Sequence, residues 1–177
     1  MANERILAIN PGSTSTKIAV YDGEEPLFVE NIVHTAEELA PFKEIFDQFE
    51  YRRDLVLAAM RERGVEPESL TAVVSRGGLL APVPAGAFEI NDDVVWQLRY
   101  RPENEHPSNL GASIAKSIAD GLGLKAYIYD PVTVDEMAPV AKVPACRSFV
   151  ARVSATRSTC ALQLTSTRPA RACVTRA

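Results

Sequence analysis

Residues 6–21 read Ile-Leu-Ala-Ile-Asn-Pro-Gly-Ser-Thr-Ser-Thr-Lys-Ile-Ala-Val-Tyr, and this stretch decides how the chain begins to fold. An apolar run reaches Asn10, a group of small polar residues follows, and a second β-favouring run covers residues 18–21. Apolar runs separated by glycine and small polar residues are typical of two strands joined by a tight loop. The stretch therefore predicts a strand, a short polar loop and a return strand.

The residues that follow extend this pair of strands into a sheet. Residues 22–23, Asp-Gly, are a hairpin turn signal, and β-favouring residues continue over 26–33, so three antiparallel strands are expected to open the domain. From residue 37 to 63 apolar residues recur at spacings of three and four, which predicts a helix that Pro41 splits or begins and Gly64 ends.

Strands and helices alternate in the rest of the domain. Residues 71–75 and 125–129 have the composition of short buried strands, and residues 91–98 and 107–122 have helical spacing with capping residues at their starts. The order β-β-β-α-β-α-β predicts an α/β fold with a mixed sheet and helices on its faces. This is the arrangement of RNase H-like and actin-like ATPase domains.

The bulk composition excludes several classes of protein. The chain has 177 residues, 46% of them hydrophobic, with a formal net charge of −4, so it can bury a sizeable core and is not a basic nucleic-acid-binding protein. No apolar run reaches the roughly 18 residues of a membrane span, and the start lacks the pattern of an export signal, so a cytoplasmic location is expected.

The composition changes abruptly after Val143. The first 143 residues carry all 23 acidic residues, whereas the last 34 contain six arginines, all three cysteines and no lysine, acidic residue or glycine. The cysteines lack the spacing of a metal site. We therefore expect a globular domain over residues 1–143 and a disordered basic tail over 144–177, produced by a frameshift and a premature stop.

Candidate functional residues follow the strands. Asn10, Arg76 and Asp130 each stand at a strand end, where ligands of open α/β sheets gather, and His106 directly precedes a helix. Three of them also have a simpler interpretation: a surface ion pair for Arg76, a turn residue for Asp130 and a structural role for His106.

The loop after Asn10 has the chemistry of a phosphate site. Its backbone N–H groups, hydroxyls and ammonium suit phosphate oxygens, although it lacks the P-loop motif and joins strand to strand. Taken alone, a loop of this composition is more often only a turn. The candidate residues are Gly12, Ser13, Thr14, Ser15 and Lys17.

Four segments together resemble one known family. Residues 6–17, 74–86, 105–111 and 127–137 are similar, in sequence and in order, to segments of the acetate and butyrate kinase family, and most of all to the butyrate kinases within it. The resemblance covers about residues 5–143. It implies an actin-like domain and reversible phosphoryl transfer from ATP to a short-chain carboxylate, butyrate or isobutyrate, giving the acyl phosphate and ADP with the help of Mg²⁺.

The resemblance also implies roles for the candidate residues. Asn10 would orient phosphate and Mg²⁺, and Asp130 would help to hold the metal. Arg76 would pair with the carboxylate or the transferring phosphoryl group, and His106 would stabilise charge on that group.

Family members are longer than this chain and can associate into homo-oligomers. Their second domain brings a triple-glycine phosphate loop, which residues 144–177 cannot contain because they have no glycine. We therefore expect the nucleotide-binding second domain to be absent and the activity to be impaired. The alternatives are a non-catalytic binding module whose arginine-rich tail contacts nucleic acid, and an inert fragment.

Overall fold

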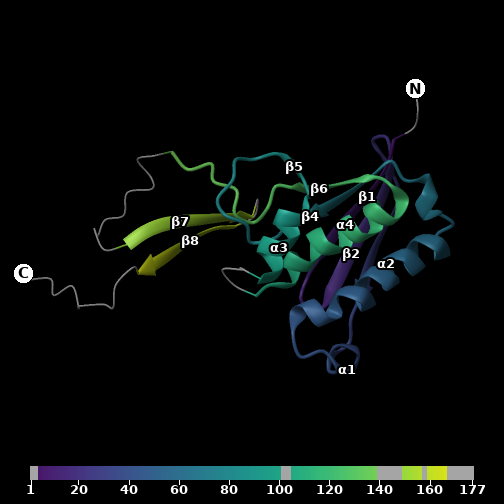
Figure 1. The fold of residues 1–177 in the computed structure, drawn as a ribbon, viewed down its shortest axis with the longest axis horizontal. Helices are drawn as coiled ribbons and strands as arrows, with labels where there is room; N and C mark the ends of the chain where they lie inside the picture. The colour runs from purple at the N-terminus through teal and green to yellow at the C-terminus, as the bar shows by residue number, and fades with distance from the viewer. Residues whose placement is uncertain (1–3, 101–104, 139–148, 157–158, 167–177) are drawn as a thin grey trace, which may run out of the picture.

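A six-stranded mixed sheet carries the fold in the computed structural model, which describes residues 4–100, 105–138, 149–156 and 159–166, the last two ranges by their backbone alone. The strands are β1 (Arg5–Pro11), β2 (Ser15–Asp22), β3 (Glu25–Val33), β4 (Ala72–Arg76), β5 (Ala87–Glu89) and β6 (Lys125–Tyr129). They lie in the order β3-β2-β1-β4-β6-β5 (Figure 1). β1, β4 and β6 run parallel, and each remaining pair of neighbours is antiparallel. The mixed sheet predicted from the sequence is confirmed, with β5 added at one edge.

Among the described residues, four α-helices and three short 3₁₀ turns connect the strands. They are α1 (Ala36–Leu39), η1 (Ile45–Gln48), α2 (Phe49–Glu62), η2 (Pro67–Ser69), α3 (Asp92–Tyr100), η3 (Pro107–Asn109) and α4 (Leu110–Leu122). The helical pattern predicted for residues 37–63 is interrupted around Pro41, which lies between α1 and η1. Within the described part of the chain, no helix is both long enough and apolar enough to cross a bilayer.

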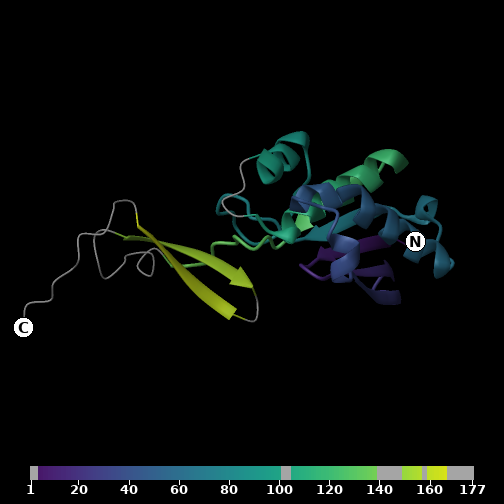
Figure 2. The same cartoon turned by 90° about the horizontal axis from the view of Figure 1, so that it is seen from below.

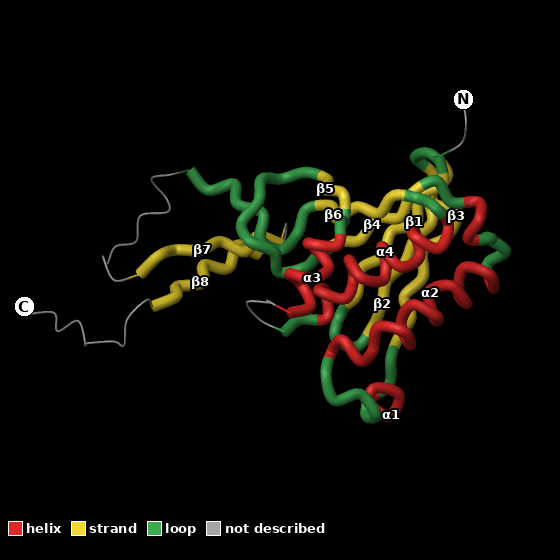
Figure 3. Tube along the Cα trace, in the orientation of Figure 1, coloured by secondary structure: helices red, strands yellow, loops and turns green. Residues whose placement is uncertain are grey.

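The hydrophobic core lies between the sheet and the helices α2 and α4, which cover the same face of the sheet (Figures 2 and 3). Side chains alternate between the two faces of a strand, so every second strand residue points into this core. The core residues with the least exposure include Leu7, Ile9, Ile18, Val20, Val73 and Ile128 from the strands, with Val56, Met60, Leu110 and Ile114 from the helices.

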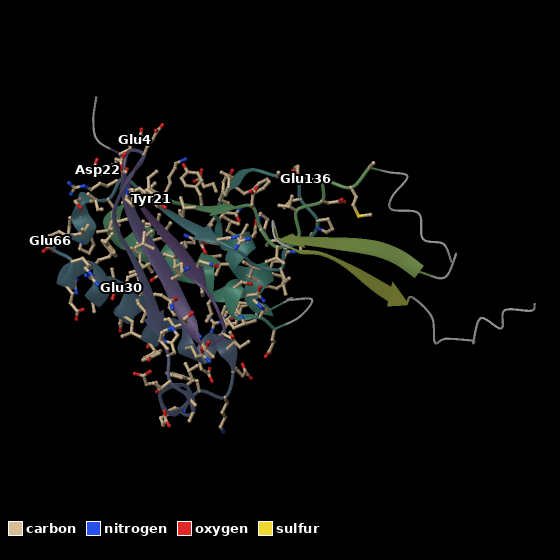
Figure 4. The ribbon with its side chains drawn as sticks, turned by 180° about the vertical axis from the view of Figure 1, so that it is seen from behind. Glu4, Tyr21, Asp22, Glu30, Glu66 and Glu136 are labelled. Carbon is tan, nitrogen blue, oxygen red and sulfur yellow. The ribbon has the colours of Figure 1, made fainter. Side chains whose placement is uncertain are left out.

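The opposite face of the sheet carries no described helix (Figure 4). The alternate strand residues point to this side, and several are large and apolar: Val29 is 58% exposed and Tyr129 is 51% exposed. Tyr21 lies on the same face (Figure 4). Parallel strands usually have both faces covered, so this bare face is an exception. It leaves a surface of the sheet open to a ligand.

Two further strands, β7 (Phe149–Thr156) and β8 (Thr159–Ser166), pair antiparallel with each other in a separate two-stranded sheet. They fall within the basic segment 144–177. The other residues of that segment lie outside the described ranges, and the prediction that the segment is disordered stays a prediction.

Candidate functional site

Three of the predicted site residues stand at one edge of the sheet. β1, β4 and β6 are parallel neighbours, so their carboxyl ends, which carry Asn10, Arg76 and Asp130, reach the same edge. Arg76 is directly opposite Tyr129, and Asp130 follows Tyr129 in the chain. Because neighbouring strands are about 4.8 Å apart, the three strand ends fall within roughly 10 Å.

A groove on the bare face of the sheet brings Asn10, Lys17 and Arg76 together. Asn10 is opposite Lys17 in the β1–β2 register, and both side chains are exposed. The groove has a volume of about 310 Å³, and its other lining is mostly apolar, including Tyr21, Val29, Val74 and Tyr129. Neither Lys17 nor Arg76 forms an ion pair with a described residue. Two free cations beside an apolar surface suit a small anion that has an alkyl group.

The loop between β1 and β2 is a tight turn of three residues, Gly12 to Thr14. The Gly12 N–H donates to the Ser15 carbonyl at 2.7 Å, which closes the loop. The Thr14 carbonyl accepts the N–H of His34, the residue after β3, at 2.9 Å, so the chain leaving β3 also supports the turn. Ser13 and Thr14 are exposed, and no described group accepts their N–H groups. The loop therefore offers two free N–H donors and several hydroxyls to solvent.

A buried arginine of α2, which the sequence analysis did not identify, holds this loop from below. Arg52 Nη1 donates to the Gly12 carbonyl at 2.8 Å and to Thr16 Oγ1 at 3.1 Å. Nη2 donates to the Ser13 carbonyl at 3.1 Å and to Gln48 Oε1 at 2.8 Å, and Nε donates to the same Gln48 oxygen at 3.0 Å. All five guanidinium N–H groups are thus used. The conformation of the loop depends on a side chain from another element.

Arg52 is fully buried without a carboxylate partner. Its side chain is 0% exposed, and it forms no ion pair within the described ranges. Burial lowers the pKa of the Arg52 guanidinium. An arginine side chain nevertheless stays charged in proteins at neutral pH. Since all its acceptors are neutral, one positive charge remains uncompensated beneath the loop.

His34 lies beside this arginine and is also buried. Its Nε2 is 2.8 Å from Thr16 Oγ1, its ring packs edge-on against Tyr51, and its Nδ1 has no hydrogen-bond partner in the described structure. Burial first, and the positive charge of Arg52 second, lower the pKa of the His34 imidazole. His34 is therefore neutral at pH 7, which agrees with a structural role.

The turn after Arg76 lies against the start of η3. Gly77 has a φ of +103°, and a β-carbon at this position would be 2.8 Å from the Ser108 β-carbon. The Leu79 N–H donates to Asn109 Oδ1 at 2.9 Å. Glycine is required here for both reasons, the backbone angle and the close approach. This packing links the position of Arg76 to that of the residues after His106.

His106 begins η3 and does not line the groove that holds Arg76. Its Nδ1 accepts the Ser108 N–H at 3.1 Å and lies 2.7 Å from Ser108 Oγ. The imidazole lines a separate cavity of about 180 Å³ together with residues that include Arg99, Tyr100 and Glu105. Because Nδ1 accepts a backbone hydrogen bond, the proton of the neutral ring is on Nε2, which makes Nε2 a donor.

Asp130 is half-buried and has a φ of +42°, an uncommon angle for a residue other than glycine. Its Oδ1 accepts the Gly86 N–H at 3.1 Å, and its own N–H donates to the Gly86 carbonyl at 3.1 Å. One carboxylate oxygen is therefore used in holding the segment before β5. The other oxygen accepts no hydrogen bond from a described residue and is available for a cation.

The oxygen donors at this edge fit a magnesium ion only as part of a larger complex. Within the described ranges no three His, Cys, Asp or Glu side chains come together as a metal cluster. Asn10 and Asp130 supply one amide and one carboxylate. Mg²⁺ is commonly held by one or two carboxylates together with substrate phosphates, so these residues fit an ion that arrives with a nucleotide.

Comparison with known proteins identifies the chain's relatives. No protein-family model matches the chain. Butyrate kinase 1 of Clostridium acetobutylicum is 45% identical over 139 residues, and butyrate kinase 2 of the same organism is 44% identical over 138 residues. Over this region the chain is similar in sequence to the butyrate kinases. The predicted resemblance to the acetate and butyrate kinase family is therefore confirmed.

The matched region covers 78% of the chain but 39% of each of these relatives, so the chain spans about two fifths of their length. Two solved structures share the fold. Acetate kinase from Entamoeba histolytica has a TM-score of 0.55 and 13% identity over 84% of this chain and 43% of that one. Porphyromonas gingivalis acetate kinase has a TM-score of 0.51 and 12% identity over 81% and 41%. The predicted fold class is confirmed.

Proposed function

We propose that the domain formed by residues 1–143 serves an ATP-dependent kinase that converts butyrate, or a similar short-chain carboxylate, and ATP into the acyl phosphate and ADP. The single observation that carries the proposal is the 45% identity to a butyrate kinase over 139 residues. The groove supports it, because a carboxylate with a short alkyl chain matches cations beside an apolar surface. We assign the reaction to the cytoplasm, where ATP is available.

In this proposal Arg76 binds the carboxylate of the acid. A planar guanidinium can donate two parallel hydrogen bonds to a carboxylate, which fixes the orientation of the attacking oxygen. The alkyl chain would contact Val74 and Tyr129, which line the groove beside Arg76. Positioning of this kind is the main contribution of a protein to phosphoryl transfer.

The loop from Gly12 to Ser15, with Lys17, would bind phosphate oxygens of ATP through its N–H groups, hydroxyls and ammonium. Asn10 and Asp130 would hold Mg²⁺ in the complex with the nucleotide. The ion, when bound, neutralises negative charge on the phosphates. His106 would donate a hydrogen bond from Nε2 to the transferring group, with Nδ1 kept as an acceptor by the Ser108 N–H.

A chimera tests the proposal. Residues 1–138 of this chain would replace the matching part of butyrate kinase 1, and acyl phosphate formed from ATP and butyrate would be trapped with hydroxylamine. We expect turnover in the ordinary enzyme range of about 1 to 10³ s⁻¹. A soluble, folded chimera that forms no acyl phosphate would show that this domain does not provide the carboxylate side of the reaction.

A further inference from the structure

We propose that Arg52 is a positioning residue for the loop Gly12–Ser15, and that its buried, unpaired charge makes this loop a binding site for a phosphate group. The inference rests on the proposed function, since that phosphate would belong to the nucleotide. It goes beyond it by assigning the anion affinity of the loop to a side chain of α2 that does not touch the ligand. Three observations support the assignment.

The first is the direction in which Arg52 orients the peptide groups of the loop. The guanidinium binds the carbonyls of Gly12 and Ser13 at 2.8 and 3.1 Å. In a trans peptide the carbonyl and the following N–H point in opposite directions. The N–H groups of Ser13 and Thr14 therefore point away from Arg52, on the side where both residues are exposed. Two neighbouring N–H groups that point to the same side can both donate to one anion.

The second observation is the charge. Arg52 is 0% exposed, and its acceptors are three carbonyls, one hydroxyl and one amide oxygen, all of them neutral. A buried ion without an opposite charge is costly to the fold. Its positive potential acts through the two peptide dipoles that it orients, so their N–H ends are more attractive to an anion. Neutral donors could hold the same carbonyls without this effect.

The third observation is the identity of residue 48. Gln48 Oε1 accepts hydrogen bonds from both Nε and Nη2 of Arg52, so it lies at the edge of the guanidinium where a carboxylate could also bind. A glutamate at this position would be sterically equivalent and would neutralise the buried charge. The amide found here leaves the charge unpaired, in the direction of the loop.

Gln48→Glu separates the charge of Arg52 from its structural role. The variant keeps the acceptor for Arg52 and should leave the loop conformation and the thermal stability intact, or raise the stability. For a unit charge roughly 8 Å from the anion and an effective dielectric constant of about 20, neutralisation should weaken phosphate binding about thirtyfold. The matched control is Gln97→Glu, the same change on α3, which should alter binding less than about twofold.

The experiment uses the full 177-residue chain and inorganic phosphate as the probe, at constant ionic strength. Binding is followed through the amide NMR shifts of Ser13 and Thr14. We expect saturable shifts in the parent chain, a dissociation constant about thirtyfold higher in Gln48→Glu, and no comparable change in Gln97→Glu. Arg52→Lys, which keeps the charge, should retain more phosphate binding than Arg52→Met.

The outcomes distinguish the two proposals. If the parent chain shows no phosphate-dependent shifts at Ser13 or Thr14, the loop is not a phosphate site, and both the loop assignment and this inference fail. If the parent binds phosphate and a folded Gln48→Glu variant binds it equally well, Arg52 has only a structural role. In that case the inference fails while the proposed function stands.

Discussion

Replacement of Gly77 by alanine tests whether the turn after Arg76 sets the position of η3. Gly77 has a φ of +103°, and an added β-carbon would be 2.8 Å from the β-carbon of Ser108, closer than two such atoms can lie. Either the turn or η3 must move. Since Arg76 precedes Gly77 and His106 precedes Ser108 by two residues, the substitution should disturb both sides of the candidate site.

The expected loss of stability has two parts. An alanine at this positive φ costs about 1 to 2 kcal/mol in backbone strain. Forcing an extra methyl group into a packed contact adds about 1 to 3 kcal/mol. The control is Gly123→Ala, because Gly123 has a φ of +68° and no atom within 4 Å of an added β-carbon. Gly123→Ala should therefore lower the free energy of unfolding by the backbone strain alone, about 1 to 2 kcal/mol.

The assay is equilibrium unfolding of the two variants and the parent chain in urea, monitored by circular dichroism. Gly77→Ala should lower the free energy of unfolding by about 2 to 5 kcal/mol in total, with an unchanged dependence on urea concentration. If the two variants lose the same free energy to within about 0.5 kcal/mol, the contact between Gly77 and Ser108 does not restrain η3 and the reasoning is wrong.

Three further predictions concern single side chains. In the chimera with butyrate kinase 1, Arg76→Ala should lower kcat/KM for butyrate by about 10² to 10³, because a charge-assisted contact is lost. Arg76→Lys should recover part of this loss. A decrease of less than about threefold in a folded Arg76→Ala variant would contradict the assignment. Because the pKa of His34 is lowered in the folded chain by burial and by Arg52, the unfolded chain binds a proton more readily. The free energy of unfolding should therefore have its full value above about pH 6.5 and should fall by up to about 1.4 kcal/mol per pH unit below it. Urea unfolding from pH 7.5 to 5 measures this decline. An equal decline in His34→Gln would show that His34 does not cause it. Asn109→Ala should lower the free energy of unfolding by about 1 to 3 kcal/mol, since the Leu79 N–H loses its acceptor. Amide hydrogen exchange at Leu79 should become faster. Unchanged protection at Leu79 would show that another group accepts its hydrogen bond.

The sequence predicted the part of the fold that depends on local patterns. The three opening strands, the parallel strands and the helices between them have clear apolar periodicity, and the structure contains them all. β5 was missed because a strand of three residues, Ala87–Glu89, shows no periodicity, and only its pairing with β6 defines it. Similarly, Asn10 and Arg76 could be assigned to one edge of the sheet from parallel strand ends, but their groove depends on a bare sheet face that no local pattern indicates.

Arg52 shows most clearly why the support of a site is harder to predict than its exposed residues. It lies on the buried face of α2 with Val56 and Met60, so a charge in an apolar stripe was the available signal. This pattern alone does not determine the role of the arginine, because an arginine in such a stripe can reach solvent with its head group or bind a carboxylate. Only the backbone of a loop some 40 positions earlier in the chain, which provides carbonyls in place of a carboxylate, gives this arginine its role. The positions of the exposed residues of this site can be predicted from strand order, whereas the role of the residue that orients the loop depends on tertiary contacts.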